Sequence, residues 1–158
     1  MNLLRPLLTT CWLLAVLPLA VSPASAQSLL GQPYLGGAFQ LVQPGLHLQA
    51  GVMGLIVPGL GVRGDATVTF GGDYLLGASA LYHGTFLPGS PFEGYFGGGP
   101  RFGSVSAGGE RRLRAGAGVI AGGAFSIGPT GVFGEAAADW LSAAGLVPSV
   151  RLGLRFYP

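Results

Sequence analysis

The sequence predicts an all-β fold: an eight-stranded antiparallel up-and-down transmembrane β-barrel that follows a cleaved signal peptide. Three observations favour this fold. Turn-forming residues divide the chain at regular intervals, and apolar and polar residues alternate between those turns. Only 9% of the residues are charged, against about 25% in ordinary soluble domains.

The first 26 residues have the three-part layout of a secretory signal peptide. Arg5 gives a positive start, residues 7–19 are almost wholly apolar, and the small residues Ala24-Ser25-Ala26 form an A-x-A cleavage site. The apolar run contains a proline and is shorter than the ~20 residues that a bilayer span needs. This favours cleavage over an uncleaved anchor helix. We therefore expect a signal peptide at 1–26 and one outer-membrane β-barrel domain at 27–158.

Cysteine and charge content exclude several kinds of site in the mature chain. The only cysteine, Cys11, lies inside the signal peptide, so neither a disulfide nor a cysteine-based metal site is expected. It sits midway through the apolar run, whereas a lipid-attachment cysteine would follow that run. After cleavage seven arginines face six acidic residues and there is no lysine, which gives no electrostatic case for a nucleic-acid partner. We expect no cofactor.

Eight strands are predicted from one end of the mature chain to the other. Glycine recurs through every segment, which disfavours helix, and an even strand number is typical of single-chain bacterial barrels. The expected strands are Pro33–Val42, Leu46–Val57, Leu60–Phe70, Asp73–Thr85, Phe92–Gly103, Leu113–Ile127, Gly131–Leu141 and Val147–Tyr157.

Alternation along these strands separates an apolar face from a polar one. In the third strand Val62 and Val68 share one face, and Arg63 and Asp65 share the other. A soluble sandwich would also alternate, with its apolar face inward. The polar face, however, is poor in charge and rich in glycine, which suits the narrow lumen of an eight-stranded barrel. We therefore expect apolar side chains to face lipid and polar side chains to fill the lumen.

The charged residues of the polar face are expected to form a lumen charge network. Five arginines oppose five acids there, and buried ions are costly unless they are paired. The expected members are Arg63, Arg101, Arg114, Arg151 and Arg155 against Asp65, Asp73, Glu93, Glu135 and Asp139.

A last hairpin that turns about Gly145 would set Asp139 opposite Arg151 and Glu135 opposite Arg155. Arg101 and Arg114 would then need acids from elsewhere, and Asp73 is the nearest candidate.

Aromatic residues on the apolar face give a further indication. A spanning barrel carries aromatic girdles at both membrane surfaces. With both chain ends on the periplasmic side, two such sets are expected. Phe70, Tyr74, Phe102 and Trp140 fall near the outer rim, and Tyr82, Phe92, Phe125 and Phe156 fall near the inner rim.

Only one predicted outer loop, Ser104–Arg112, is long enough to extend beyond the end of the barrel. Its Arg111 and Arg112 are candidates for contact with anionic lipid headgroups or surface polysaccharide, because arginine pairs well with phosphate. The alternative is a solvated turn.

Catalytic and metal-binding residues are not predicted. The two histidines, His47 and His83, fall at opposite ends of the barrel, and His83 is expected to face Glu93 as a lumen pair. The stretch Gly94-Tyr95-Phe96-Gly97-Gly98-Gly99 lacks the lysine and the following helix of a phosphate-binding loop. We therefore expect a protein that is not an enzyme.

The last strand carries apolar residues at alternate positions before its aromatic end: Val150, Leu152, Leu154 and Phe156. With the signal peptide and strand count, this resembles the small eight-stranded outer-membrane β-barrel proteins, the group that includes the OmpA membrane domain. The resemblance covers residues 27–158. It implies location in the cell outer membrane, contact with its lipid, periplasmic chaperones and insertion by an outer-membrane assembly machinery that reads this pattern. Here Tyr157 and Pro158 follow the aromatic residue, which departs from the group.

Three functions are consistent with these features. The first is a structural protein that supports envelope integrity, with its lumen plugged by paired charges. The second is a narrow pore for ions or small solutes. The third is a soluble periplasmic barrel that binds an apolar ligand.

Overall fold

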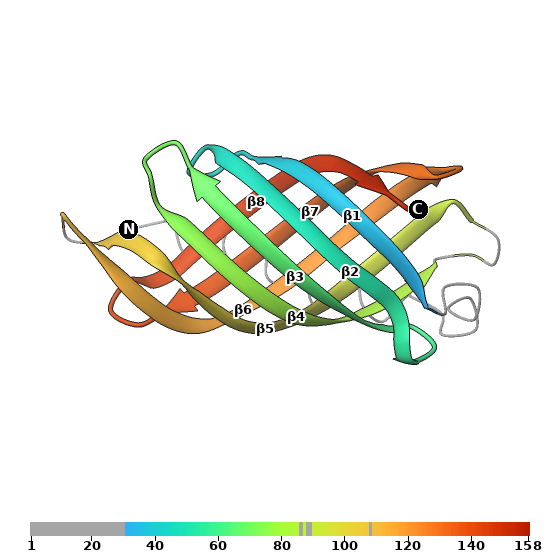
Figure 1. Cartoon of the computed structure of the whole chain (residues 1–158), viewed down its shortest axis with the longest axis horizontal. Helices are drawn as coiled ribbons and strands as arrows, with labels where there is room; N and C mark the ends of the chain where they lie inside the picture. Colours follow the sequence, from blue (N-terminus) through green and yellow to red (C-terminus); the bar gives the residue numbers. More distant parts are fainter. Residues whose placement is uncertain (1–30, 86, 88–89, 108) are drawn as a thin grey trace, which may run out of the picture.

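The protein is a single closed barrel of eight antiparallel strands (Figure 1). The computed structural model describes residues 31–158 apart from 86, 88, 89 and 108, so the predicted signal peptide lies outside the described residues. The strands are β1 (Gln32–Gln40), β2 (Gly45–Val57), β3 (Leu60–Thr69), β4 (Tyr74–Thr85), β5 (Phe92–Ala107), β6 (Glu110–Ile127), β7 (Thr130–Leu141) and β8 (Gly145–Phe156). The predicted all-β fold class and the count of eight strands are confirmed.

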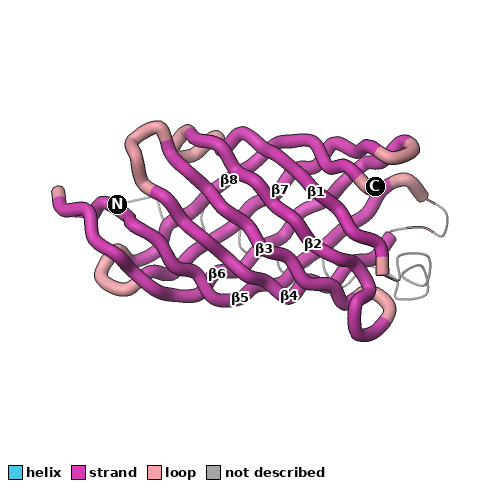
Figure 2. The backbone as a smooth tube through the Cα atoms, in the orientation of Figure 1, coloured by secondary structure: helices cyan, strands magenta, loops and turns pink. Residues whose placement is uncertain are grey.

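Closure depends on pairing between the first and last strands. β1 runs antiparallel to β8 from Leu35 opposite Phe156 to Gln40 opposite Arg151. Every other strand pairs with its neighbours in sequence, and the described part of the backbone tube consists of strands joined by short connections (Figure 2). Such closure leaves no sheet edge, so backbone N–H and C=O groups find partners within the sheet. Across the described part of the chain, no helix is long and apolar enough to cross a membrane.

The two ends of the barrel are distinguished by their connections. The β1–β2, β3–β4, β5–β6 and β7–β8 hairpins turn at one end, which we call the outer end in keeping with the predicted threading. The start of β1 and the end of β8 lie at the opposite, inner end.

Apolar side chains cover the outside of the barrel, and polar side chains fill its interior. Leu154 is 66% exposed, whereas the neighbouring Arg155 is 1% exposed. The same alternation holds in β3, where Val62 and Val68 are exposed and Arg63 is buried. Ordinary soluble domains have the reverse arrangement. Period-2 alternation therefore predicted the two faces and their direction.

Two strands extend further than the sequence indicated. The segment Ser104–Arg112 was expected to be a loop, but β5 continues to Ala107 and β6 begins at Glu110. Ser106 pairs with Arg111 in this extension. The reversal includes Gly109, whose φ of +83° is in the left-handed region that tight hairpins use. The predicted loop at Ser104–Arg112 is therefore wrong in extent, because strand pairing continues to Ala107 opposite Glu110.

The register of the last hairpin also differs from the predicted one. Glu135 pairs with Arg151, and Asp139 pairs with Val147. The reason is the turn: Leu141 already pairs with Gly145, so only three residues lie between the strands. Gly145, at φ +77°, starts β8 instead of occupying the centre of the turn. The shift changes every partner but, because it is an even number of residues, it leaves each side chain on its predicted face.

Outward aromatic residues lie toward both ends of the barrel. Phe70 belongs to an outer turn, and Trp140 is one residue from the outer end of β7. At the inner end, Phe92 begins β5 and pairs with Phe125, and Phe156 ends β8. All five are exposed, which is the placement expected of aromatic girdles.

Candidate functional site in the barrel lumen

The lumen is filled by charged side chains that bond to one another across the barrel. Arg63, Arg101, Arg151 and Arg155 are among the largest fully buried side chains of the described residues. They come from β3, β5 and β8, where alternation directs them inward. A buried charge is tolerated only when it is paired and hydrogen-bonded, so their partners decide whether this lumen is stable.

Glu135 is the centre of the largest cluster. Its Oε1 accepts a hydrogen bond from Nη1 of Arg151 at 2.7 Å, and its carboxylate also accepts from both Nη atoms of Arg63. Arg63 additionally donates to Oε1 of Gln49 at 2.8 Å, and its Nε lies 3.5 Å from Oδ1 of Asp65. The hydroxyl of Tyr95 donates to Glu135 at 3.2 Å. This cluster ties β3, β5, β7 and β8 together through the lumen.

A second pair lies closer to the outer end. Nε of Arg101 donates to Oδ1 of Asp139 at 2.7 Å, and its Nη atoms reach the hydroxyl of Ser79 at 3.1 Å. The pair joins β5 to β7 over β6, where Gly118 lies between them. A Cβ at Gly118 would lie 1.9 Å from Oδ1 of Asp139 and 2.8 Å from Nε of Arg101. Glycine therefore makes the room for this ion pair.

The third cluster lies toward the inner end and includes aromatic rings. Glu93 accepts from Nη1 of Arg155 at 3.1 Å and lies 2.7 Å from Nδ1 of His83, so the predicted contact between His83 and Glu93 is present. The guanidinium carbon of Arg155 lies 4.4 Å from the ring centroid of Tyr34 and 4.7 Å from that of Tyr95. These distances are in the range of cation–π attraction.

The inward aromatic residues were not predicted. Tyr34, Tyr95 and Phe133 surround Arg155, with the Phe133 ring centroid at 5.3 Å. Their positions carried a signal in the sequence: Tyr95 lies two residues from Glu93, and Phe133 two residues from Glu135. Period 2 places each pair on the same face.

Two predicted members of the network have different surroundings. Asp73 lies in the β3–β4 turn at the outer rim, where its Oδ1 accepts from the side chain of Ser106 at 2.8 Å and from Nε of Arg111 at 3.2 Å. Arg114 is buried and meets no carboxylate among the residues that the structure describes; it donates to the backbone oxygens of Val105 and Ser142. Asp73 is therefore not the partner of Arg101 or Arg114.

The predicted balance of five against five is accordingly wrong for the lumen. Among the described residues, five arginines point inward against four acids, namely Asp65, Glu93, Glu135 and Asp139. The acid that is missing from the lumen is Asp73, which stands on the rim because β4 begins one residue after it. The excess arginine is Arg114, near the outer mouth.

Arg111 and Arg112 lie on β6 and are exposed at the outer rim. Arg111 bonds to Asp73 and donates to the backbone oxygen of Gly71, while Arg112 forms an ion pair with Glu110. Both arginines therefore already have acidic partners, and exposed pairs of this kind contribute little to stability.

The residues of the expected assembly signal lie outside the barrel. Val150, Leu152, Leu154 and Phe156 are all exposed on β8, and the following Tyr157 is buried. Their alternation is therefore presented on the apolar face that a membrane or a partner sheet would meet.

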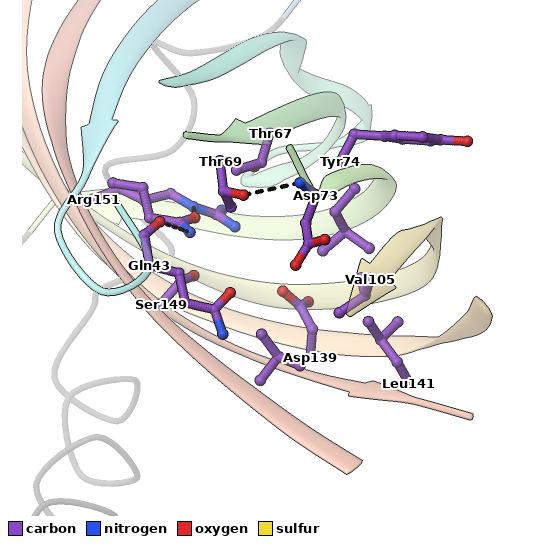
Figure 3. A pocket seen from close by; sticks show the side chains of 13 residues that line it. Gln43, Thr67, Thr69, Asp73, Tyr74, Val105, Asp139, Leu141, Ser149 and Arg151 are labelled. Carbon is purple, nitrogen blue, oxygen red and sulfur yellow. Dashed lines mark hydrogen bonds between the residues drawn. The ribbon is translucent and has the colours of Figure 1, made fainter. Parts of the chain in front are cut away.

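A small pocket opens into the lumen at the outer end, and we call it the outer pocket (Figure 3). Its lining combines polar residues, among them Thr69, Asp73, Asp139, Ser149 and Arg151, with apolar Leu75, Val105, Leu141 and Val147. Its volume is about 30 Å³, which is room for one or two water-sized groups.

The histidines do not form a catalytic or metal-binding group. Nδ1 of His47 lies 2.8 Å from the hydroxyl of Thr67, and His83 contacts Glu93. Over the described ranges, no cluster of three or more His, Cys, Asp or Glu side chains is arranged to hold a metal ion.

Comparison with known proteins identifies the fold but no family. No protein-family model and no curated protein match the sequence. The N-terminal β-barrel domain of Pseudomonas aeruginosa OprF superposes with a TM-score of 0.68 at 12% identity, over 82% of this chain and 98% of that one. Neisserial surface protein A gives 0.51 at 22% identity, over 79% and 94% of the two chains. A de novo designed transmembrane β-barrel gives 0.58 at 14% identity, over 82% and 97%. The expected resemblance to small eight-stranded outer-membrane barrels is thus confirmed as a likeness of fold.

We expect replacement of Glu135 by alanine to lower the free energy of unfolding by about 3–5 kcal/mol, because it leaves Arg63 and Arg151 buried without their shared carboxylate. Denaturant unfolding of protein refolded in detergent, followed by the fluorescence of Trp140, measures this change. Glu110→Gln is the matched control, because it removes an exposed acid that bonds only to exposed Arg112; it should change stability by less than about 0.5 kcal/mol. Equal stability of the two variants would contradict a stabilising role for the lumen charge network.

Gly118→Ala should destabilise the barrel by about 1–3 kcal/mol, because the added methyl group overlaps the bonded atoms of Arg101 and Asp139. The control is Gly134→Ala, where an added Cβ meets no atom within 4 Å. Because alanine also restricts the unfolded chain, the control should be neutral or slightly stabilising. Thermal unfolding of the two variants side by side measures the difference in stability. If Gly134→Ala lowers stability as much as Gly118→Ala does, overlap with the Arg101–Asp139 ion pair is not the cause of the destabilisation.

Proposed function

We propose that the protein is a structural barrel of a bacterial outer membrane that supports envelope integrity and whose lumen is plugged by paired charges. The observation that carries the proposal is the inverted distribution of side chains: exposed apolar residues cover all eight strands, and ion pairs occupy the interior. The fold that it shares with outer-membrane barrels supports the location in that membrane.

The exterior supports contact with lipid. Exposed Leu48, Val119, Leu152 and Leu154 would cost several kcal/mol in water, at about 25 cal/mol for each Å² of apolar surface. In a bilayer the same surface meets acyl chains. The girdle residues Trp140 and Phe156 then lie near the two membrane surfaces, where aromatic rings are favoured.

The interior supports a plug. Glu135 with Arg63, and Glu93 with Arg155, bridge strands that are not neighbours across the lumen, and Arg151 of the adjacent strand β8 bonds to the same Glu135. A hydrated ion that entered would have to separate these pairs, and breaking a buried pair costs about 3–5 kcal/mol. The rings around Arg155 fill the inner half further.

A narrow pore is the second candidate, and one observation favours it. Several buried side-chain atoms have no hydrogen-bond partner among the described residues, including Nε2 of His47, Nε2 of Gln49 and the hydroxyl of Tyr34. Buried polar atoms of this kind commonly bond to internal water. A hydrated interior is a requirement for conduction, although the ion pairs still obstruct it.

The third expectation, a soluble barrel with an apolar ligand inside, does not fit the structure. Its ligand cavity would need an apolar interior, but Arg63, Arg151 and Glu135 occupy the centre of the lumen. Its exterior would need to be polar, but Leu152 and Leu154 are exposed there.

The proposal includes the partners that the resemblance implied. The exposed pattern Val150, Leu152, Leu154 and Phe156 on β8 supports recognition by an outer-membrane assembly machinery, after periplasmic chaperones have held the unfolded chain. Arg111 and Arg112 at the outer rim keep hydrogen-bond donors that could contact lipid phosphates, although each already has an acidic partner.

Unboiled protein from the outer-membrane fraction should migrate differently from boiled protein on a detergent gel. The closed ladder of β1 with β8 keeps the barrel intact in detergent until it is heated. Identical mobility of the two samples, or recovery of the protein in the aqueous fraction without detergent, would overturn the membrane proposal.

Planar-bilayer recordings separate the plug from the pore. Refolded protein whose gel mobility shows a closed barrel should produce no stable conductance steps, because ion pairs close the lumen at two levels. Stable channels that disappear when the sample is boiled before insertion would instead establish the pore.

A further inference from the structure

Buried polar atoms without a hydrogen-bond partner are gathered on one half of the lumen. Among the described residues, every side chain with such an atom belongs to β8, β1, β2, β3 or β4. These five strands are consecutive around the closed barrel, and we call their inward side the polar wall. The side chains concerned are Ser149, Arg155, Tyr34, His47, Gln49, Arg63, Asp65, His83 and Thr85.

The opposite half of the lumen, formed by β5, β6 and β7, has no such atom among the described residues. Ile120 of β6 pairs and packs with Ala137 of β7, and Ala124 of β6 with Phe133 of β7. The carboxylate of Glu135 on the same half accepts hydrogen bonds with both of its oxygens. Unsatisfied hydrogen-bonding groups therefore follow one side of the lumen only.

The unpartnered groups of β2 and β3 occupy successive inward rows of the sheet. His47 is in the first row, Gln49 with Asp65 in the second, and Arg63 in the third. Successive inward rows are two residues apart, which is about 7 Å along a strand. A water molecule that bonds to two groups spans about 5–6 Å between them. One or two waters therefore connect each row to the next.

The series continues to the inner end of the lumen. Tyr34 shares the row of Arg63, with Gly51 between them. The ring of His83 lies edge-on to that of Tyr34, with 6.3 Å between the centroids. Thr85 is two residues beyond His83 and is buried on the same face of β4. Unpartnered groups thus recur along the whole length of the polar wall.

A pocket opens at each end of this wall. The outer pocket is lined by Ser149 and by Thr67, which bonds to His47 (Figure 3). At the inner end, a second pocket of about 130 Å³ is lined by Thr85 and Tyr157, and we call it the inner pocket. An unpartnered hydroxyl therefore stands at each mouth. The full lining of the inner pocket is Gln32, Thr85, Ser90, Pro91, Glu93, Ser126, Gly128 and Tyr157.

Charge, hydrogen bonding and size decide which molecule can follow the polar wall. Among the described buried residues five arginines face four acids, and their ion pairs must separate before a hydrated ion passes. The unpartnered atoms include a donor, Nε of Arg155, and an acceptor, Oδ1 of Asp65, which accepts no hydrogen bond although Nε of Arg63 is 3.5 Å away. A neutral molecule that both donates and accepts satisfies both kinds of atom. At about 30 Å³, the outer pocket admits a molecule the size of water.

We propose that a file of water follows the polar wall from the outer pocket to the inner pocket, and that water crosses the barrel through it while ions do not. This path presupposes the membrane-spanning barrel and the ion-pair plug proposed above, and it adds a permeant to them. Water bonds to the unpartnered groups in turn, whereas the ion pairs beside the file remain closed.

The osmotic response of vesicles that contain the refolded barrel tests this path. After a hypertonic sucrose step, stopped-flow light scattering should show faster shrinkage than in protein-free vesicles. Ser149→Leu should return the rate to that of protein-free vesicles, because leucine fills the outer pocket and replaces a hydroxyl that has no partner among the described residues. Ser104→Leu is the matched control: Ser104 is on the outward face of β5, between buried Gly103 and Val105, and the variant should shrink as the parent does.

The stability of Tyr34→Phe tests the polar wall without transport. The hydroxyl of Tyr34 has no partner among the described residues, and the phenylalanine ring keeps its place beside Arg155. If water bonds to this hydroxyl, its removal loses a hydrogen bond and lowers the midpoint of thermal unfolding. If the wall is dry, the change removes an unsatisfied group and raises the midpoint. A raised or unchanged midpoint would overturn the water file.

Failure of the file and failure of the plug give different results. Gel mobility first verifies that each variant forms a closed barrel. Water permeability equal to that of protein-free vesicles, or unchanged by Ser149→Leu, would overturn the file and leave the plug intact. Stable conductance steps from the parent protein would overturn the plug, and with it the exclusion of ions from the file.

Discussion

The shared carboxylate of Glu135 is the interaction on which the interior depends. Because the exterior is apolar, the interior must hold the polar side chains, and eight strands leave room for little besides side chains. A buried ion there is stable only with partners. Glu135 supplies them for Arg63 and Arg151 at once, so one acid neutralises arginines from two strands and connects opposite walls of the barrel.

Glycine makes this crowded interior possible. A Cβ at Gly77 would lie 2.5 Å from Nη1 of Arg101, and one at Gly51 or Gly122 would lie 2.7 Å from the ring of Tyr34 or Tyr95. Long side chains from one strand thus lie over bare backbone of another. Glycine usually weakens a strand. Here, because each of these glycines has no side chain, an arginine or a tyrosine from another strand can occupy the space beside it.

From the sequence, the face of the barrel that each side chain occupies could be predicted more accurately than the side chain to which it bonds. Period-2 alternation assigned Arg151, Asp139 and Glu135 to the lumen, and an error of register left that assignment unchanged because the error was even. The partners themselves depended on Gly145, which begins β8 instead of centring the turn. The contact of Arg63 with Glu135 joins strands that are not neighbours, so no pairing of adjacent strands could have revealed it.

The position of Asp73, one residue before β4, determines which charged groups are paired at the outer end of the barrel. Had Asp73 been inside β4, facing the lumen, it would have neutralised the fifth arginine. Because it stands one residue before β4, Arg114 bonds to backbone oxygens instead, and Asp73 bonds at the rim to Arg111. The carboxylate removed from the lumen thereby becomes part of the outer pocket beside Asp139. A single residue of displacement along one strand thus leaves five arginines against four acids among the buried residues that the structure describes.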